Sequence, residues 1–481
     1  MSAEQDPVGP GLPDGVTSDP LPGPAFVDRV RARLPGLRLL VEPLEREAHR
    51  RDETAYLAPG LPLAVALPET TAEVAELVRL AAEDRLPVVA RGAGTGLSGG
   101  AAGIEGGLTI AFTRMNRILE IDRENLVAVV QPGVVNATLK AAVAGHGLFY
   151  PPDPASYEQC TIGGNLGTNA GGLCCVKYGQ TRDSVLGLEV VLADGSIVRT
   201  GGRNIKDVAG YALTQLFVGS QGTLGLITEA TLRLRPAPPP RSTLLAFFAT
   251  LEAAGAAVSG MTAAGLGPVT LELMDRVTIA AVDDWHHLGL DREAAAMLMV
   301  ESDLPGAGAS DELDRAALAC EQAGATLVVR AADAAEADWL RQGRRMAYHA
   351  LERLGVARME DVGVPRSRIP AMLRAIEAIG ARYGVTIGTF GHAGDGNLHP
   401  TFVFERDDPT AEATTEAARA ELYRAAIALG GTVTAEHGIG VVRRDYLLEQ
   451  VGPQAVRVMR SIKTALDPLG ILNPGRVLPP G

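Results

Sequence analysis

Apolar and polar positions in the first half of the chain alternate in patterns that predict short strands separated by helices. Residues 68–78 are predicted to form an amphipathic helix with Thr70 or Thr71 as its N-cap and acids in its first turn. The other predicted elements are strands at 86–90, 108–112, 115–122, 126–131 and 232–235, a helix at 136–144, and a hairpin of 186–192 and 197–199 that turns at Asp194-Gly195.

A proline-rich run at 236–240 marks a linker, beyond which the pattern changes to alanine-rich helices and short strands. The strands are expected at 244–249, 269–273, 295–301 and 326–330, with helices such as 251–264 and 311–323 between them. This alternation predicts an α+β domain built on an antiparallel sheet. Residues 25–55 carry a helical pattern and then charges, and residues 1–24 are rich in Pro, Gly and Asp, which predicts a disordered tail.

Three glycine-rich stretches interrupt these elements. RGAGTGLSGG begins at Arg91 directly after an apolar run, and two further stretches occupy residues 160–172 and 219–229. Glycine lets successive backbone N–H groups approach a phosphate, and Arg91 adds positive charge, although a tight turn between strands is the alternative. The first stretch continues into a strand and not into a helix, so it is not a Rossmann fingerprint. Loop amides are therefore expected to hold a pyrophosphate.

Length, charge and cysteine content narrow the class of protein. A chain of 481 residues allows two or three domains, and a net charge of -13 argues against nucleic acid as a partner. The four cysteines show no CxxC pair, which argues against structural zinc, an iron–sulfur centre or a disulfide scaffold. Cys174 and Cys175 are interpreted as small buried residues, with a redox pair as the alternative. We expect no signal peptide and no membrane span, and hence a cytoplasmic location, with the inner membrane face reached through a partner as the alternative.

Two polar clusters carry the candidate chemistry. GHAGDGNLH contains His392 and His399, and TAEHGIG contains Glu436 and His437. Glycines argue against a helix here, so a glycine bend between extended segments is expected to bring both histidines inward. Two histidines and one carboxylate make a typical divalent metal site with open positions, whereas hydrogen-bonded histidines in turns are the plainer alternative.

The order of RGAGTGLSGG, QPG, PPDP and TIGGNLGTNAGG resembles the FAD-binding domain of the vanillyl-alcohol oxidase superfamily, the PCMH type. The third stretch is similar to the GSEGTLGIIT segment of that domain, with Gln221 in the acidic position, and DPLGILNPGRVLP at 467–479 resembles the C-terminal signature of FAD-linked oxidases, which returns to the flavin. The resemblance implies bound FAD. The residues that it assigns to FAD are Arg91, Gly92, Ala93, Gly94, Thr95, Gly96, Leu97, Ser98, Pro132, Gly133, Pro152, Asp153, Thr161, Gly163, Gly164, Asn165, Thr168, Asn169, Gly171, Gly172, Gly222, Thr223, Ile227 and Asn473.

The histidine clusters resemble the active-site motifs of D-2-hydroxyacid dehydrogenases in this flavoprotein family. The resemblance implies that His392, His399 and Glu436 ligate zinc or manganese, that His437 is the general base, and that Arg344 binds the substrate C1 carboxylate. The implied reaction oxidises a D-2-hydroxy acid to the 2-oxo acid, with the C2 hydride passing to flavin N5. Arg341 and Arg345, beside Arg344, are expected on a solvated helix face.

Departures from the family pattern refine the expected substrate and cofactor. Hydroxyglutarate enzymes hold the distal carboxylate of their substrate with a lysine, and Met359 occupies that position here. Thr401 occupies the position of an asparagine in the same enzymes. These departures favour glycolate or D-lactate over D-2-hydroxyglutarate, although Arg366 could supply a second cation. Covalent members carry a histidine shortly after the start of the first glycine-rich stretch, a region that Thr95 occupies here, so we expect non-covalent FAD.

The expected organisation is a tail (1–24), an N-terminal cap segment (25–57), a PCMH-type FAD-binding domain of two subdomains (58–236), a substrate domain (241–430) and a C-terminal segment (431–481). Partners are expected to be a small 2-hydroxy acid and an electron acceptor, such as a quinone, a cytochrome or an iron–sulfur subunit; a homodimer is one option for the assembly. Two other classes stay open from the residues: a metal-dependent hydrolase, and a non-catalytic flavoprotein subunit of an electron-transfer complex.

Overall fold

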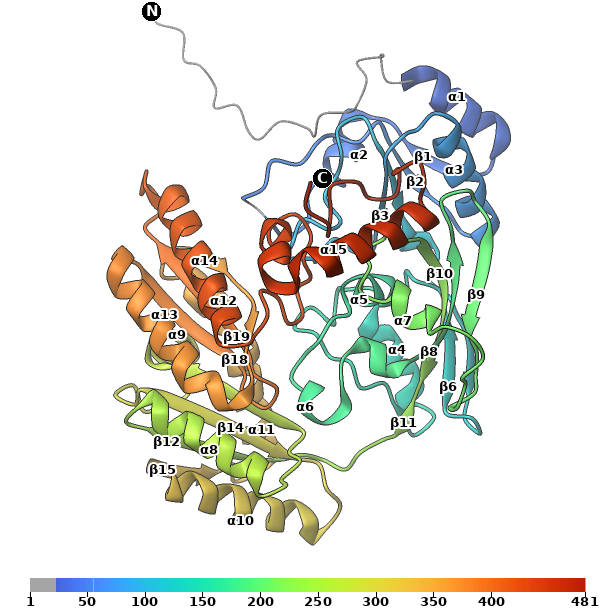
Figure 1. Cartoon of the computed structure of the whole chain (residues 1–481). Helices are drawn as coiled ribbons and strands as arrows, with labels where there is room; N and C mark the ends of the chain where they lie inside the picture. Colours follow the sequence, from blue (N-terminus) through green and yellow to red (C-terminus); the bar gives the residue numbers. More distant parts are fainter. Residues whose placement is uncertain (1–22, 55, 481) are drawn as a thin grey trace, which may run out of the picture.

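The computed structural model describes residues 23–54 and 56–480. The disordered tail predicted for residues 1–24 therefore lies almost entirely outside the described residues. The chain forms an N-terminal part of two subdomains and a C-terminal part on one large sheet (Figure 1). This arrangement confirms the α+β fold that the sequence predicts.

The first subdomain is a four-stranded sheet in the order β1-β2-β4-β3, in which β2, β4 and β3 run parallel. Its elements are α1 (Gly23–Arg33), β1 (Arg38–Leu40), α2 (Pro43–Glu47), β2 (Ala64–Leu67), α3 (Thr71–Glu83), β3 (Val88–Arg91), β4 (Leu108–Ala111) and the short helix η1 (Phe112–Arg114). Thr70 caps α3 through a capping box with Glu73. Phe26 and Val30 of α1 are buried in one core with α3, so the predicted cap segment packs directly on this subdomain.

The second subdomain is an antiparallel sheet of five strands in the order β5-β6-β10-β8-β9. Its elements are β5 (Ile118–Asp122), β6 (Val127–Val130), α4 (Asn136–Ala144), β7 (Leu148–Phe149), α5 (Ile162–Thr168), α6 (Cys175–Tyr178), η2 (Thr181–Ser184), β8 (Val185–Val191), β9 (Ile197–Gly201), α7 (Leu213–Phe217), β10 (Leu226–Arg233) and β11 (Arg235–Pro236). The predicted helix at 136–144 and the predicted hairpin are confirmed.

The C-terminal domain is an antiparallel sheet in the order β15-β12-β14-β13-β18-β19-β16, with β17 pairing β19. Its elements are β12 (Ser242–Phe248), α8 (Leu251–Ala263), β13 (Thr270–Asp275), α9 (Arg276–His286), β14 (Ala296–Ser302), α10 (Ala307–Gln322), β15 (Ala325–Arg330), α11 (Ala334–Arg345), α12 (Ala347–Glu352), β16 (Val356–Met359), β17 (Val362–Gly363), η3 (Arg366–Arg368), α13 (Ile369–Tyr383), β18 (Thr386–His392), β19 (Asn397–Phe404) and α14 (Ala411–Ala428). Helices α8, α10, α13 and α14 share one core with the sheet, while α9 and α12 belong to another.

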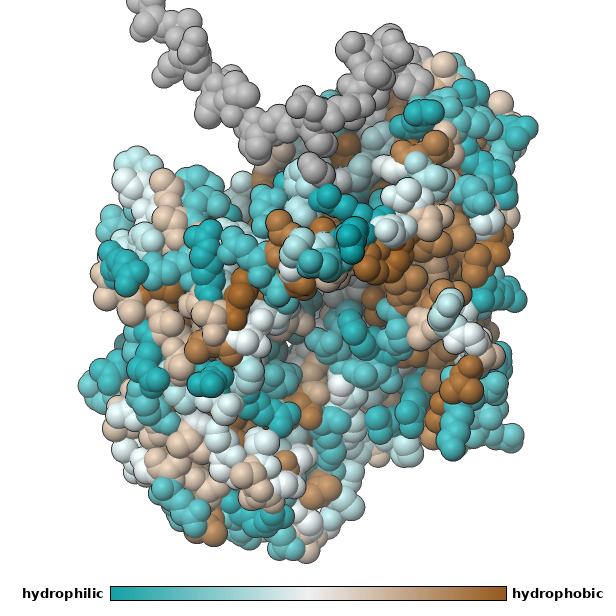
Figure 2. Space-filling model, in the orientation of Figure 1, coloured by the Kyte–Doolittle hydropathy of each residue, from teal (hydrophilic) through white to brown (hydrophobic). Residues whose placement is uncertain are grey.

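The last segment returns to the first subdomain, as predicted. After η4 (Arg444–Tyr446), helix α15 (Leu447–Leu466) crosses the N-terminal part, and Leu472 forms a parallel bridge with Val88 of β3 (Figure 1). Figure 2 shows hydrophobic residues gathered on the face beside α15. Val458 and Met459 of this helix are exposed. Within the described ranges, no helix combines the length and the apolar character needed to cross a bilayer.

Candidate active site

A cavity of about 1860 Å³ is lined by residues from both parts of the chain. Strand β3 and the start of α5 contribute from the N-terminal side, and β18, β19 and α11 contribute from the C-terminal domain. The predicted cofactor-binding residues that line it are Arg91, Gly92, Ala93, Gly94, Thr95, Gly96, Leu97, Ser98, Pro132, Thr161, Gly163, Gly164, Asn165, Thr168, Gly171, Gly172, Gly222 and Ile227. The predicted metal and catalytic residues His392, His399, Glu436, His437 and Arg344 line the same cavity.

The glycines of the first stretch are required by close packing. A Cβ on Gly92 would collide with Thr161 Oγ1, and a Cβ on Gly94, which has a φ of 83°, would collide with the Arg91 guanidinium. Arg91 is buried and donates to the carbonyl of Ala101 at 3.2 Å, so part of its role is to shape the loop. The loop is therefore a tight cradle along one wall of the cavity, of a size and composition that fits the phosphates of a dinucleotide.

The second stretch contains a helix that the sequence analysis missed. Thr161 accepts a hydrogen bond from the Gly164 N–H at 3.2 Å and caps α5, and Asn169 ends the helix in the left-handed conformation. Glycine at three of the seven helical positions hid this element, because glycine disfavours helix interiors. The N–H groups facing the first cradle thus come from a helical turn as well as from a loop.

The remaining predicted cofactor residues do not line the cavity. These are Gly133, Pro152, Asp153, Asn169, Thr223 and Asn473. Asn473 illustrates their contacts, since its Nδ2 donates to the carbonyls of Gly100 at 2.8 Å and Gln221 at 2.7 Å. Such residues fix the positions of the lining segments.

We expect Gly92→Ala to weaken FAD binding by roughly tenfold or more, because the new Cβ must displace Thr161 and with it the start of α5. Fluorescence titration of apoprotein with FAD measures the effect. Gly36→Ala is a suitable control, because a Cβ there meets no atom within 4 Å and its φ, like that of Gly92, is not positive. Equal FAD affinity in the two variants would contradict the cradle.

The predicted glycine bend brings the histidines together. Residues 393–396 turn the chain between β18 and β19, and the register pairs His392 with Asn397 and His399 with Phe390. The Nε2 atoms of His392 and His399 lie 3.4 Å and 3.2 Å from Glu436 Oε1. His437 Nε2 lies 3.9 Å from the same oxygen. Three imidazoles and one carboxylate therefore converge on one point of the cavity wall.

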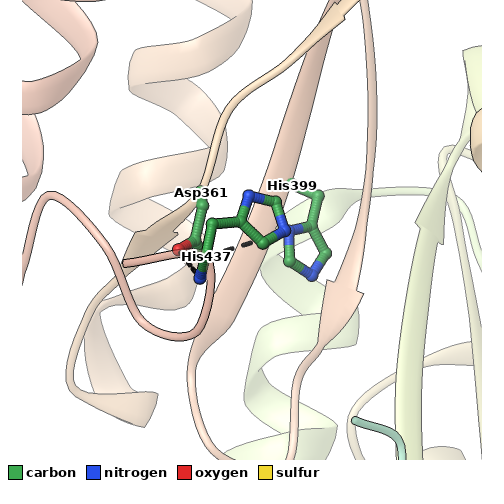
Figure 3. Close-up of side chains that lie close together, drawn as sticks. All are labelled: Asp361, His399 and His437. Atoms are coloured by element: carbon green, nitrogen blue, oxygen red, sulfur yellow. Dashed lines mark hydrogen bonds and ion pairs between the residues drawn. The ribbon is translucent and has the colours of Figure 1, made fainter. Parts of the chain in front are cut away.

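Two buried carboxylates behind this cluster were missed by the sequence analysis. Glu272 on β13 accepts from His392 Nδ1 at 2.7 Å, and Asp361 Oδ1 lies 3.9 Å from His399 Nδ1 (Figure 3 shows Asp361, His399 and His437). Asp361 Oδ2 also accepts hydrogen bonds from the N–H groups of residues 435, 436 and 437, at 2.9, 3.0 and 2.9 Å. Carboxylates placed behind histidines orient the rings and raise their basicity toward a metal. For Glu272 the signal in the sequence was a lone acid within an apolar strand, whereas Asp361 follows Glu360 between β16 and β17 and carried no such signal.

The donor set and its charges fit a divalent cation. His392, His399 and Glu436 offer ligand atoms within 4.8 Å of one another, and so do Asp361, His399 and His437. The first group lines the cavity, whereas Asp361 is fully buried behind it. Burial would lower the pKa of His392, but Glu272 and Glu436 raise it well above its ordinary value; burial would likewise raise the pKa of Glu436, which the two histidines hold well below its usual range. A cluster so strongly charged in a buried place is typical of a metal site.

His437 differs electrostatically from the other two histidines. Burial lowers the pKa of His437 to about 4, so the imidazole is neutral at pH 7. Its ring stacks on that of His399 with centroids 5.2 Å apart, and its Nδ1 has no hydrogen-bond partner among the described residues. A neutral imidazole at the cavity wall can accept a proton.

The arginines of α11 do not lie on a solvated face, contrary to the sequence prediction for two of them. Arg344 is buried, forms an ion pair with Glu272 and lies over the Phe390 ring at 4.8 Å. Arg341 pairs with Glu301 at 2.8 Å, and Arg345 with Asp153 at 3.1 Å. Buried acids therefore neutralise the charges of these three arginines. The hydropathy of the sequence does not reveal such pairing.

The positions that bear on substrate size lie on neighbouring strands. Met359 of β16 pairs with Thr401 of β19, and Met359 lines the cavity. Arg366, in η3, is exposed and does not line it, so the prediction that it could supply a second cation is wrong. The cause is the turn at Pro365, which directs the chain into η3 on the surface.

A glycine-lined cavity joined to a histidine and carboxylate cluster is the arrangement expected of a flavin-dependent oxidoreductase. Residues 237–477 match the family model "FAD linked oxidases, C-terminal domain", and residues 62–201 match "FAD binding domain". The chain belongs to the FAD-linked oxidase family and uses FAD, which confirms the resemblance seen in the sequence.

Individual relatives agree with this assignment. The chain is 46% identical to "Glycolate oxidase subunit GlcD" of Bacillus subtilis, over 87% of this chain and 89% of that protein. It is 38% identical to "D-lactate dehydrogenase" of Archaeoglobus fulgidus, over 90% of this chain and 96% of that protein. Among solved structures, p-cresol methylhydroxylase with substrate bound has the same fold, with a TM-score of 0.80 at 19% identity, covering 97% of this chain and 98% of that one.

Proposed function

We propose that this protein oxidises a small D-2-hydroxy acid, glycolate or D-lactate, to the 2-oxo acid with non-covalent FAD and a divalent metal. The observation that carries the proposal is the convergence of His392, His399 and His437 on Glu436 Oε1 within the cavity that the cradle lines. The names of the two relatives, a glycolate oxidase subunit and a D-lactate dehydrogenase, support the same substrate class.

His392, His399 and Glu436 would hold zinc or manganese, which would supply a Lewis acid for the substrate hydroxyl. A hydrogen bond to Glu272 keeps the His392 imidazole turned toward that position, and the Asp361 carboxylate lies 3.9 Å behind the His399 ring. The His/His/carboxylate set leaves further coordination positions open, and these suit a hydroxyl and one carboxylate oxygen of a 2-hydroxy acid. A metal-dependent hydrolase would use the same ligands but would leave the glycine-lined cradle unused.

Arg344 is the group best placed to bind the C1 carboxylate. Its Nε has no hydrogen-bond partner among the described residues, while its ion pair with Glu272 and the Phe390 ring fix the guanidinium plane. A fixed planar fork suits bidentate binding of a carboxylate. Glu272 thus links the substrate-binding arginine to a metal ligand.

His437 accepts the hydroxyl proton at Nε2. Its depressed pKa keeps the ring neutral at pH 7, so a proton acceptor is present before the substrate arrives. Bound FAD supplies the acceptor for the hydride that leaves C2. The substrate loses one proton and one hydride in total, and the 2-oxo acid is the product.

Electrons then leave for an acceptor outside this chain. The described residues contain four unpaired cysteines and no cluster of cysteines that could hold iron and sulfur. The Bacillus subtilis relative is named as a subunit. A quinone, a cytochrome or an iron–sulfur subunit is therefore the proposed acceptor.

Met359→Lys should raise the preference for D-2-hydroxyglutarate over D-lactate by roughly tenfold, because a charge-assisted hydrogen bond becomes available to the distal carboxylate. The ratio of kcat/KM for the two acids measures this. Met359→Gln is the control, because it adds a polar head without a charge. An unchanged ratio in the lysine variant would remove Met359 from the determinants of substrate size.

Denaturation should release all the FAD, since Thr95 occupies the region in which covalent members carry a histidine. Acid precipitation followed by absorbance at 450 nm of the supernatant and the pellet tests this expectation. Yellow colour retained by the washed pellet would show a covalent bond and contradict it.

The proposed function is tested by anaerobic addition of substrates to the purified holoprotein. Glycolate or D-lactate should bleach the flavin absorbance, L-lactate should not, and D-2-hydroxyglutarate should act slowly. Flavin that none of the four acids reduces would overturn the proposal. Fastest bleaching by D-2-hydroxyglutarate would instead overturn the part that concerns substrate size.

A further inference from the structure

The loop of residues 434–441, which carries Glu436 and His437, is held from two sides. From the C-terminal domain, Asp361 accepts the backbone N–H groups at its start, and Arg443 donates to the Gly438 carbonyl at 3.3 Å. The opposite contacts come from segments near the flavin cradle. Those contacts belong neither to the metal ligands nor to the base, and they have no role in the reaction described above.

Gln221 makes the central contact from the flavin-binding side. Its Oε1 accepts the Gly440 N–H at 2.8 Å, and its Nε2 donates to Ser98 Oγ at 3.1 Å. Its own backbone is equally constrained, because its N–H donates to the Gly167 carbonyl at 2.8 Å and its carbonyl accepts from Asn473. One buried side chain therefore joins the cradle to the loop that carries the proposed base.

The glycines that follow His437 are shaped around this contact. A Cβ on Gly438 would collide with Gln221 Nε2, and a Cβ on Gly440 would collide with the Ser98 carbonyl. Both glycines also have positive φ values, 87° and 52°. The loop can approach Gln221 and Ser98 this closely only because both positions lack a side chain.

Two further hydrogen bonds join the flavin-binding side to the loop of residues 434–441. The Val441 N–H donates to the Ser98 carbonyl at 2.8 Å. Gln180 Nε2 donates to the Ala435 carbonyl at 2.9 Å, while its Oε1 accepts from Asn169. The backbone on both sides of Glu436 and His437 is thus fixed to residues of the N-terminal part.

We propose that Gln221 is a positioning residue that sets the place of His437 and Glu436 relative to the flavin cradle. The proposal deepens the proposed function and rests on it for its kinetic consequence. Gln221 touches neither the metal ligands nor the base side chain directly, and acts through Gly440. An acceptor atom at the Oε1 position is the required feature, because the backbone N–H of Gly440 points to it.

Two substitutions separate the hydrogen bond from the volume of the side chain. Gln221→Met has a similar length but cannot accept the Gly440 N–H well. Gln221→Glu keeps an acceptor for that N–H, and its second carboxylate oxygen can accept a hydrogen bond from Ser98 Oγ. We expect the methionine variant to reduce the rate of flavin reduction by about 10- to 100-fold through misplacement of the base, with the substrate Kd changed less than about threefold. The glutamate variant should recover most of the rate. Gln215→Met, an exposed glutamine on α7, is the matched control.

Hydrogen exchange at Gly440 gives a readout that does not depend on the reaction. In the holoprotein, Gln221→Met should make this amide exchange roughly three- to tenfold faster, as expected for one lost hydrogen bond, while Gln221→Glu and Gln215→Met stay near wild type. Unchanged exchange and an unchanged rate in the methionine variant would overturn the positioning role. Faster exchange together with flavin that no 2-hydroxy acid reduces even in the wild-type protein would leave the link in place and reject the proposed function. Equal loss in the glutamate and methionine variants would show that the Nε2 donor to Ser98, which both variants lack, matters and the acceptor does not, and would overturn the proposal.

Discussion

Flavin reduction by the best substrate is expected to slow by about 10²- to 10⁴-fold in His437→Ala, the range that removal of a general base produces. FAD and metal content should stay at wild-type values, because His437 lies outside the proposed ligand set and the cradle. Burial lowers the pKa of His437 to about 4 and keeps its imidazole neutral at pH 7, whereas His392, His399 and Glu436 are the proposed metal ligands. Anaerobic stopped-flow absorbance at 450 nm measures the rate.

His146→Ala is the control for this substitution, since that histidine is exposed beyond α4. A rate in His437→Ala within about threefold of wild type would remove His437 as the base. A loss of metal together with the rate would instead place it among the ligands with Asp361 and His399, the second group whose ligand atoms lie close together.

Glu436→Gln is expected to lower metal occupancy to less than about one-tenth of wild type and to abolish turnover, because an amide oxygen is a much weaker ligand than a carboxylate. Glu436 Oε1 lies 3.4, 3.2 and 3.9 Å from the Nε2 atoms of His392, His399 and His437, so its charge also holds the cluster together. Metal analysis of the protein after dialysis, with flavin absorbance recorded on the same sample, gives both quantities.

Glu405→Gln serves as the matched control, because Glu405 is exposed at the end of β19 and the substitution is chemically identical. Full metal occupancy in Glu436→Gln would show that the ion lies elsewhere. Loss of flavin along with the metal would indicate a folding defect, and in that case His392→Ala provides an independent test of the same ligand set.

The sequence predicts the elements well where local chemistry determines them. The capping box of Thr70 and Glu73, the Asp-Gly hairpin and the strands beyond the proline linker depend on neighbouring residues, and the structure has all of them. The glycine bend between His392 and His399 is of the same kind. Helix α5 was missed because three of its seven residues are glycine, which disfavours helix interiors, and the close packing of Gly163 on Pro132 is visible only in the fold.

The supporting residues of the site could not be predicted, because they come from segments far apart in the chain. Glu272 lies 120 positions before His392, and Gln221 contacts Gly440 across 219 positions. A local sequence pattern cannot reveal such contacts. The pairing of β13 with β18 creates the first, and the return of the C-terminal segment creates the second. The ion pairs of Arg341 and Arg345 arise in the same way, which is why their helix face was misjudged.

The central claim is that one cavity holds both FAD and a metal that act together on a 2-hydroxy acid. Anaerobic flavin bleaching by D-lactate or glycolate, measured before and after removal of metal with EDTA and after addition of zinc or manganese, tests it most directly. We predict rapid bleaching in the untreated protein, loss of bleaching with flavin retained after EDTA, and recovery with one of the two metals. Undiminished bleaching in protein shown to be free of metal would contradict the claim.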